Sequence, residues 1–329
     1  MNEPGKTKFQ IDLRRHLREN EVDENLTHLI CEIAEASKYI IHSIRTGDLG
    51  VAGTSNLYGE KQLALDVLAD RILRKRLDHS RVVANMMSEE MDSIIPVSPD
   101  WEGKYSVAFD PLDGSSLVDV NLAVGTIVAI FPGCDILRPG GEQIAAMYIL
   151  YGPRTTLVYS VGKGVHEFGL NSLMEYTLLQ ENITMKTKGN LHSPGGLRNL
   201  YTPGVETLLS TLEQRGSKLR YSGGFVPDIN QVLLKKGGLF FYPHLKDNPK
   251  GKLRLLFELS PMAFLLEQAG GAASNGKQRI LDLMPQHIHE RAPVFIGSKE
   301  DVALAEELIR KYEGEGEKVQ PIKKDAVQA

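Results

Sequence analysis

Cysteine is scarce in this sequence, since Cys31 and Cys134 are the only two among 329 residues. Two thiols make neither a disulfide scaffold nor the paired sulfurs of a structural zinc site. Cys31 lies within an apolar helical pattern and is expected to fill the core, whereas Cys134 lies in a loop-like segment. The chain is long enough to bury an apolar core without such cross-links.

Long apolar runs are missing as well. No segment approaches the roughly 18 uninterrupted apolar residues that a membrane-spanning helix needs. The first ten residues, MNEPGKTKFQ, lack the apolar stretch of a secretory signal. We therefore expect a cytoplasmic protein without a membrane partner.

The chain has no excess of positive charge. Its 38 Lys and Arg residues stand against 42 Asp and Glu residues, a net charge of −4. A general nucleic-acid binder is expected to show a basic excess, so no nucleic-acid partner is predicted. A small anionic substrate stays possible, because a local basic pocket need not appear in the total.

What the chain does have is an ordinary globular composition, with 42% hydrophobic and 24% charged residues. Its length allows two domains, and the Gly-, Pro- and Asn-rich segment 189–203 suggests a division into 1–188 and 189–329. Apolar spacing predicts helices over 26–44, 60–77, 205–214 and 260–269, and strands over 82–84, 105–109, 122–131, 144–151, 156–161, 239–242 and 252–258. These elements predict mixed α and β layers.

The most informative pair of residues is Asp110 and Asp113, directly after the predicted strand 105–109. Pro111 stiffens the turn, so that the two carboxylates can converge, and the Gly-Ser-Ser segment 114–116 offers amides and hydroxyls to a phosphate oxygen. A cation between carboxylates and phosphate would join the two halves, and oxygen ligands favour magnesium or manganese over zinc. The alternative is an ordinary acidic turn, but the further acids of the chain favour the metal site.

Those further acids lie at two other places. Glu89 and Glu90 follow the strand predicted over 82–84, where they could also form a solvated turn. Glu60 and Asp66 lie near the start of the second predicted helix, where Glu60 could serve the helix dipole. Asp66 lies between two apolar residues, so its partial burial would require a partner.

The predicted strand 252–258 would place its side chains on two faces. Lys252, Arg254 and Glu258 would share one face, with apolar residues on the other. The two cations suit a phosphate and the carboxylate suits a metal. The alternative is an amphipathic strand whose charges are merely solvated.

Taken together, these segments resemble the class I fructose-1,6-bisphosphatase family, within the magnesium-dependent, lithium-sensitive phosphatase superfamily. The resemblance covers about residues 25–310, and its most specific string is FDPLDGSSLVDVNLAVGTI at 109–127, supported by SEE at 88–90 and GKLRLLFE at 251–258. It implies a layered α/β sugar phosphatase fold with mixed sheets between helical layers. The N-terminal, regulatory-type domain would carry most metal ligands, and the C-terminal domain would bind substrate.

The resemblance also implies roles for individual residues. The expected metal ligands are Glu89, Asp110, the backbone carbonyl of Leu112, Asp113 and Glu258. The expected catalytic residues are Glu60, Asp66 and Glu90, with Asp66 paired to Glu90. Substrate would be held by Asp113, Gly114, Ser115, Ser116, Arg220, Tyr221, Tyr242 and Lys252. Arg220 matches a position that the family donates across a subunit interface, which implies a homotetramer.

The activity implied is hydrolysis of the 1-phosphate of fructose 1,6-bisphosphate to fructose 6-phosphate and phosphate. Two or three Mg²⁺ ions per site are implied, with Mn²⁺ possible. A catalytically silent sugar-phosphate sensor is the non-enzyme alternative, and the proton acceptor expected at Glu90 speaks against it. An inositol-monophosphatase-like activity is disfavoured, because several cations suggest a second phosphate to be held.

Some segments depart from the fructose enzyme. Residues 192–199, 151–156 and 221–231 look closer to sedoheptulose-1,7-bisphosphatase. That activity, or a dual one, is therefore the leading alternative. Within the first segment, Arg198 and Asn199 could take over phosphate contacts.

Two other positions differ from the family pattern. Glu60 stands where many members have aspartate, a change in reach that keeps the charge. Thr27, Lys104 and Tyr105 match the nucleotide inhibitor site, but Pro132 occupies the place of a phosphate-binding arginine. Loss of that charge-assisted contact leaves AMP inhibition open.

Two weaker signals are set aside. Residues 271–277 have Walker A spacing, but Gln278 replaces the Ser or Thr that binds magnesium, and a helix rather than a strand precedes the segment. His287 and His289 form a close histidine pair, which is more often found at the surface or in the core than around a metal.

Overall fold

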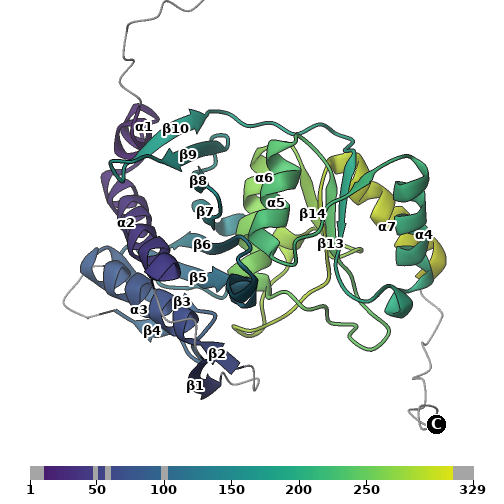
Figure 1. Ribbon diagram of the computed structural model, residues 1–329, viewed down its shortest axis with the longest axis horizontal. Coiled ribbons are helices and arrows are strands. Elements are labelled where there is room, and N and C mark those ends of the chain that lie inside the picture. Colours follow the sequence, from purple (N-terminus) through teal and green to yellow (C-terminus); the bar gives the residue numbers. More distant parts are fainter. Residues whose placement is uncertain (1–10, 47–50, 56–60, 98–102, 314–329) are drawn as a thin grey trace, which may run out of the picture.

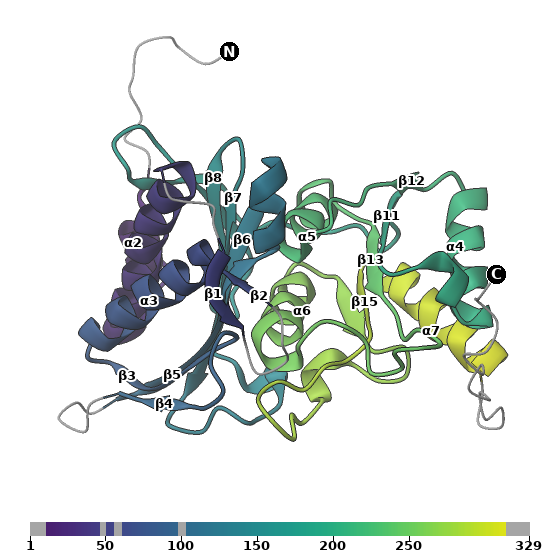
Figure 2. The same cartoon turned by 60° about the horizontal axis from the view of Figure 1, so that its bottom comes forward.

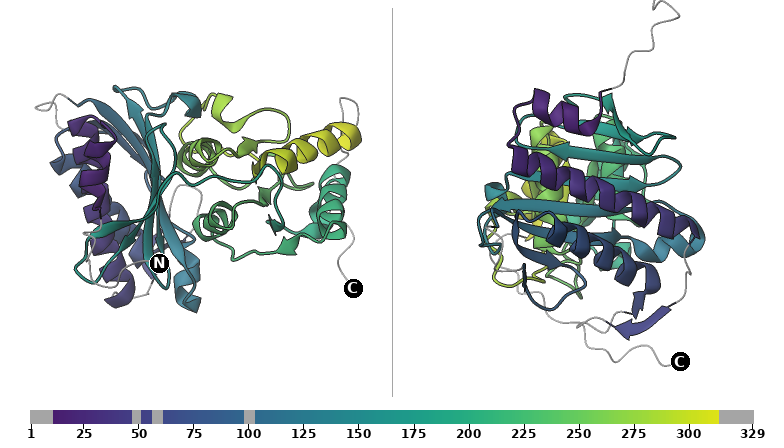
Figure 3. Two further views of the ribbon diagram at one scale, coloured as in Figure 1. Left: turned by 90° about the horizontal axis from the view of Figure 1, so that it is seen from above. Right: turned by 90° about the vertical axis from the view of Figure 1, so that its left-hand side faces the viewer.

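The structure is a computed structural model that describes residues 11–46, 51–55, 61–97 and 103–313. Two sheets and several groups of helices alternate in layers, as Figure 1 and the view from above in Figure 3 show. This is the predicted layered α/β architecture, with mixed sheets between helical layers.

The helices fall into three groups by position. Their bounds are α1 Leu13–Glu19, α2 Glu24–Thr46, α3 Ala64–His79, α4 Pro203–Gln214, α5 Phe225–Leu234, α6 Ser260–Gln268 and α7 Lys299–Glu313. Helices α1, α2 and α3 cover the outer face of the larger sheet, α5 and α6 lie between the two sheets, and α4 and α7 cover the smaller sheet (Figures 1 and 2). Among the described residues, no helix combines the length and the apolar character required to span a bilayer.

The strands form a hairpin and two sheets. The hairpin pairs β1 Val51–Ser55 with β2 Lys61–Leu63. The larger sheet contains β3 Val83–Ser88, β4 Ile95–Pro96, β5 Tyr105–Asp113, β6 Val124–Pro132, β7 Ala145–Tyr151, β8 Thr155–Ser160, β9 His166–Leu170 and β10 Tyr176–Gln180. The smaller sheet contains β11 Leu191–Pro194, β12 Lys218–Leu219, β13 Leu239–Tyr242, β14 Ala272–Ser274 and β15 Val294–Gly297.

The larger sheet has eight strands in the order β10-β9-β8-β7-β6-β5-β3-β4. Strands β3 and β5 pair in parallel, and the other neighbours pair antiparallel. Because helices cover both faces, β6 is almost continuously apolar and buried instead of alternating with polar residues.

The smaller sheet has five strands in the order β12-β11-β13-β15-β14. Strand β11 pairs in parallel with β12 and β13, whereas β15 pairs antiparallel with β13 and β14. Strand β11 lies within the segment 189–203 that was expected to separate two domains. The division after residue 188 stays a prediction.

Apolar cores fill the spaces between the layers. One core joins the outer helices to the larger sheet and includes Leu17, Ile33 and Val107. A second joins the other face of that sheet to α5, α6 and the smaller sheet, and a third lies beneath α4 and α7. Burial of the apolar faces of these sheets and helices stabilises the layers that surround the candidate site.

Most predicted elements are present. The helix expected over 26–44 lies within α2, and the strands expected over 122–131, 144–151 and 156–161 correspond to β6, β7 and β8. The start of the second predicted helix is wrong, because residues 61–63 pair with β1 and α3 begins only at Ala64. Glu60, a predicted catalytic residue, lies outside the described residues.

Candidate active site

Parallel pairing brings two acidic segments to one edge of the larger sheet. Ser88, the last residue of β3, is in register with Phe109 of β5. The amide of Glu89 then donates to the Phe109 carbonyl, at 3.0 Å. Because parallel strands end at the same edge, Glu89 and Glu90 arrive beside Asp110.

An irregularity in the pairing of β5 with β6 directs the two aspartates. Asp110 is opposite Ile127 and Asp113 is opposite Gly125, so three steps on β5 face two on β6. The turn is fixed by the amide of Leu112, which donates to Asp110 Oδ1 at 2.9 Å. The extra residue allows both carboxylates to point into the same space, which strict alternation along a strand would not.

Asp113 also receives the first amides of α5. The Val226 amide donates to its Oδ2 at 2.7 Å, and the Phe225 amide donates to its Oδ1 at 3.3 Å. This close approach depends on glycine, since a Cβ on Gly125 would lie 2.5 Å from the Val226 side chain. Gly114 turns the chain away in the left-handed region, with φ of +73°.

The expected strand over 252–258 is wrong. Arg254 makes a single bridge with Arg291, and residues Leu255–Leu259 then form a π-helical turn that runs directly into α6. The helical winding places Glu258 four residues after Arg254, and its Oε2 accepts a hydrogen bond from the Arg254 amide at 2.5 Å. The apolar alternation misled the prediction because the whole stretch Leu253–Leu259 is buried, and no face of it is solvated.

Three carboxylates converge in the interior. One oxygen each from Asp110, Asp113 and Glu258 can be chosen so that all lie within 4.8 Å of one another, and all three residues are buried. Glu89 stands beside them, where it pairs with Arg254 Nη1. Four expected metal ligands, distant in the sequence, are thus neighbours.

The electrostatics of this carboxylate cluster fit a cation. Burial, and next the charge of Glu89, raise the pKa values of Asp110 and Glu258 well above their usual range. Burial raises the pKa of Asp113 to about 7, although backbone hydrogen bonds from Val226 and Phe225 oppose the shift. Buried acids this close cannot all ionise without a compensating charge. Their all-oxygen donor set suits Mg²⁺ or Mn²⁺.

The carboxylate cluster lines a cavity of about 350 Å³. Leu112, Gly114, Ser115 and Ser116 line it beside the acids. Tyr221, Tyr242 and Lys252 also line it, and the Lys252 ammonium lies 5.6 Å from the centre of the Tyr242 ring. Burial, and then Tyr242, raise the pKa of Tyr221 to about 12, so its hydroxyl is a hydrogen-bond donor at neutral pH.

The other predicted residues are distributed as follows. Asp66, buried in the first turn of α3, and Glu90 both line the cavity. Arg220 is exposed and lies outside the cavity lining, where its Nη1 donates to the Leu219 carbonyl at 2.9 Å. Arg198 is also outside and forms a surface ion pair with Glu206 at 2.7 Å. The expected contact between Asp66 and Glu90 stays a prediction.

Two features of the cavity escaped the sequence analysis. Arg291 lines it, but a single arginine in a loop carries no pattern that could reveal it. The α5 amides that bind Asp113 were also missed. Here a signal existed, because Gly223 and Gly224 precede an apolar segment and such a helix start presents free amides.

Three regions that the sequence analysis set aside or left open can now be described. Among the described residues, His289 does not join His287 in a metal-binding group, and its Nε2 donates to the Met91 carbonyl at 2.9 Å. The Walker-like segment contains β14 and follows α6, as expected. In the possible nucleotide site, the Tyr105 hydroxyl donates to Asp23 at 2.8 Å, so an acid stands beside one of the residues that match this site.

Comparisons with known proteins agree with this geometry. Family models described as the N-terminal and C-terminal domains of fructose-1,6-bisphosphatase match residues 6–181 and 185–310. A class 1 fructose-1,6-bisphosphatase from Syntrophotalea carbinolica is 70% identical over 94% of this chain and 97% of its own length. The counterpart from Chloroherpeton thalassium is 42% identical over 91% and 93%. The crystal structure of Leishmania major fructose-1,6-bisphosphatase in holo form has a TM-score of 0.87 at 31% identity, covering 91% of this chain and 98% of that one. The chain belongs to the fructose-1,6-bisphosphatase family, class 1.

Proposed function

We propose that this chain is a phosphoric monoester hydrolase that removes the 1-phosphate of fructose 1,6-bisphosphate, giving fructose 6-phosphate and phosphate. The observation that carries the proposal is that a single cavity is lined both by a buried carboxylate cluster and by Tyr221, Tyr242 and Lys252. A sugar that carries two phosphates matches both groups, and the relatives at 65–70% identity are named for this substrate.

The carboxylate cluster is assigned to divalent cations, with Mg²⁺ as the proposed ion and two or three per site. Asp110, Asp113, Glu258, Glu89 and the carbonyl of Leu112 are the proposed ligands, and Glu89 would exchange its arginine partner for the metal. Bound there, the ions supply positive charge for the phosphate and lower the pKa of a water molecule. The raised pKa values of the carboxylates support this assignment, because a cation removes their mutual repulsion.

The chain's own residues perform the remaining steps. Glu90 accepts a proton from the attacking water, and Asp66 orients Glu90 from the first turn of α3. The amides and hydroxyls of Gly114, Ser115 and Ser116 hold the phosphate that is removed. Lys252 and the hydroxyls of Tyr221 and Tyr242 hold the sugar and the second phosphate, which positions the substrate for in-line attack.

A phosphate-release panel tests the activity. The full-length protein is assayed with fructose 1,6-bisphosphate, sedoheptulose 1,7-bisphosphate and inositol 1-phosphate, each with Mg²⁺ and after chelation. We expect turnover of the first substrate that disappears on chelation and returns with added Mg²⁺. A silent sensor would bind the bisphosphates without releasing phosphate. A greater kcat/KM for the seven-carbon sugar would assign the chain to the alternative suggested by segment 192–199.

The assembly proposed is a homotetramer. Arg220 is exposed and does not line the cavity of its own chain, which supports its expected role in a neighbouring subunit's site. Light scattering on the eluting protein measures the number of chains directly. The cytoplasmic location expected from the sequence stays a prediction.

A further inference from the structure

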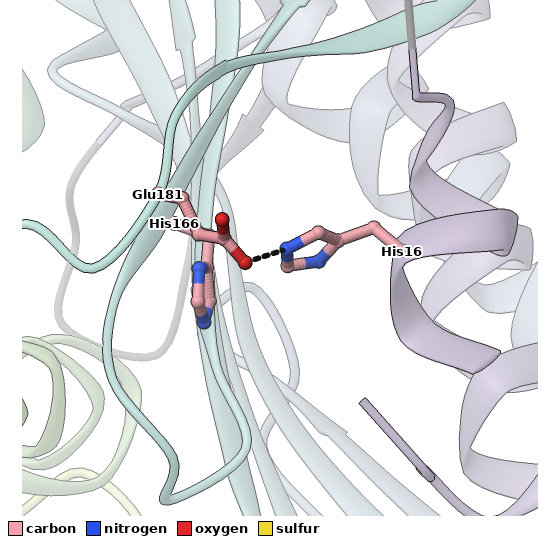
Figure 4. Close-up of side chains that lie close together, drawn as sticks. All are labelled: His16, His166 and Glu181. Atoms are coloured by element: carbon pink, nitrogen blue, oxygen red, sulfur yellow. Dashed lines mark hydrogen bonds and ion pairs between the residues drawn. The ribbon is translucent and has the colours of Figure 1, made fainter. Parts of the chain in front are cut away.

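A second group of metal-binding side chains lies far from the proposed catalytic cavity in the sequence and in the fold. It consists of His16 on α1, His166 at the start of β9 and Glu181 just after β10. None of the three lines the carboxylate cavity. In Figure 4, His16 reaches from the helix toward the sheet, where Glu181 and His166 face it. The proposed function gives these residues no role.

The spacing of the three residues suits one small cation. One ligand atom from each lies within 4.8 Å of the other two. His16 Nε2 and Glu181 Oε1 are 3.1 Å apart. Two ligands that are each roughly 2.0–2.1 Å from a tetrahedral zinc ion lie about 3.3 Å from each other. The pair therefore needs almost no adjustment, and His166 needs a modest movement.

The imidazole of His16 is already oriented for a metal. Its Nδ1 lies 2.6 Å from the hydroxyl of Tyr159, a buried residue of β8. When Nδ1 carries the proton and donates it to this hydroxyl, the Nε2 lone pair is left for a ligand on the side of Glu181. The Asn20 Nδ2 amide lies 3.3 Å from Nε2 and would give up this long contact to a metal, while it keeps its 2.9 Å hydrogen bond to the His16 carbonyl. Metal-binding histidines usually have such a partner on the second ring nitrogen, which fixes both tautomer and ring direction.

His166 is held in a similar way. Its Nε2 lies 3.1 Å from the Lys163 carbonyl and can donate to it. Its Nδ1 has only a long contact of 3.4 Å with the Asn182 amide, so this lone pair is available at little cost. Burial lowers the pKa of His166, which favours the neutral imidazole that binds metals.

Burial and charge complete the site. The His16 and His166 residues are each 2% exposed, whereas the Glu181 side chain is 48% exposed. Two neutral imidazoles and one carboxylate give the ligand set a charge of −1, which a divalent cation converts to +1. The exposed carboxylate gives an ion a path from solvent.

We propose that His16, His166 and Glu181 form a second metal site, selective for a transition metal such as Zn²⁺ over Mg²⁺, that fastens α1 to the β9–β10 edge of the larger sheet. Nitrogen ligands and three protein donors suit zinc, whereas Mg²⁺ requires oxygen ligands in an octahedron. The edge is where the N-terminal part of the described chain meets the sheet, through the bridge between Asp12 and Thr177. The bound ion would thus act as a cross-link in this region.

Cobalt spectroscopy on the full-length protein tests the site. Co²⁺ is titrated in the presence of saturating Mg²⁺, because four-coordinate Co²⁺ with nitrogen ligands absorbs visible light far more strongly than six-coordinate Co²⁺ among oxygens. We expect one strongly absorbing Co²⁺ per chain, displaced by one equivalent of Zn²⁺. His166→Gln and Glu181→Gln should abolish the band or weaken binding at least about tenfold, and Tyr159→Phe should weaken it about tenfold.

Matched variants separate this site from the others. His42→Gln removes an exposed histidine of α2 and should leave the band unchanged. Glu258→Gln alters the carboxylate cluster and should also leave the band unchanged. The Glu181→Gln variant changes a half-exposed side chain, and its Mg²⁺-dependent phosphate release should match the parent and so report a folded enzyme. An identical Co²⁺ band in the parent and in both ligand variants, or no intense band in any of them, would overturn the proposal.

Discussion

At the scale of single residues, the main feature of the catalytic cavity is its concentration of negative charge. Asp110, Asp113 and Glu258 are buried within a few ångströms of one another, and the nearby guanidinium of Arg254 pairs with Glu89. Such an arrangement is costly for the bare protein and becomes favourable once cations enter. The crowding therefore supports the proposal that these acids bind divalent ions.

Glu90→Gln tests the proton acceptor. The amide keeps the size of the side chain but cannot take the proton from water, so kcat should fall by about 10²–10⁴-fold, the usual contribution of a general base. Substrate binding should change little, because Glu90 is assigned no contact with the sugar. Steady-state phosphate release gives kcat, and titration calorimetry with the bisphosphate gives affinity. Near-normal turnover in this variant would remove Glu90 from the mechanism.

The pKa shifts predict how metal binding depends on pH. In the metal-free fold the pKa of Asp113 is raised to about 7, and burial raises those of Asp110 and Glu258 well above their usual range. A raised folded pKa means that the metal-free protein loses stability as pH rises through it, since the folded state holds protons that the unfolded state has released. Mg²⁺ replaces these protons, so its stabilising effect should grow from pH 5 to pH 8.

Thermal unfolding with and without Mg²⁺ measures this effect. At a Mg²⁺ concentration about 100 times its Kd, the gain should approach ~2.7 kcal/mol near pH 8 and shrink at pH 5. The Glu258→Gln variant serves as control, because it removes one of the coupled acids and should flatten the pH dependence. A Mg²⁺ effect that is equal at both pH values would contradict the linkage.

At the scale of elements, the site depends on how strands and helices end. Parallel strands β3 and β5 deliver their acids to one edge, and the irregular step in β5 aims both aspartates inward. Helix α5 then fixes Asp113 through its first amides. The π-helical turn before α6 adds Glu258 from the far side. The backbone of an ordered strand or helix positions each of these acidic side chains, so we expect the site to be rigid.

Gly125→Ala tests the packing of α5 against β6. A Cβ there would lie 2.5 Å from the Val226 side chain, so the helix must shift away from the strand. Overpacking of this kind typically costs about 1–3 kcal/mol of stability. The shift should also draw the Phe225 and Val226 amides from Asp113 and change the apparent affinity for Mg²⁺. Gly152→Ala is the matched control, since its Cβ would meet its nearest atom at an ordinary 3.4 Å.

The sequence predicted the local parts of this arrangement better than the non-local ones. The acids around Asp110 were identified because a strand, a stiff turn and a Gly-Ser-Ser segment follow one another in the chain. The strand predicted over 252–258 was wrong, because a segment buried on all sides can show the same apolar alternation as a strand. Arg291 and the cluster of His16 with His166 could not be found, because only tertiary packing brings them to their neighbours.

At the scale of the whole molecule, the catalytic cavity draws on both sheets and on the helices between them. Acids come from the larger sheet and from the π-helical turn before α6, whereas Tyr242 comes from β13 of the smaller sheet. Relative placement of the two sheets therefore sets the distance between the acids and Tyr242. Arg220 is the exception among the predicted substrate contacts, because it does not reach the cavity of its own chain.

Subunit mixing tests whether Arg220 completes a neighbouring site. Arg220→Ala alone should raise KM about ten- to hundredfold, the value of one charge-assisted contact of roughly 1.5–3 kcal/mol. Glu90→Gln alone should be nearly inactive. In mixed assemblies, a subunit with an intact Glu90 can receive Arg220 from the partner that lacks Glu90, so that complete sites form again.

The mixture should therefore show activity at low substrate concentration beyond the sum of the two variants. Co-expression with two affinity tags isolates the mixed assemblies, and single-tag preparations of each variant provide the baseline. Activity equal to that sum would mean that Arg220 acts within its own chain or not at all. In that case the exposed arginine would have to be explained without an interface, and the proposed tetramer would lose its functional support, whereas the proposed role of the carboxylates would be unaffected.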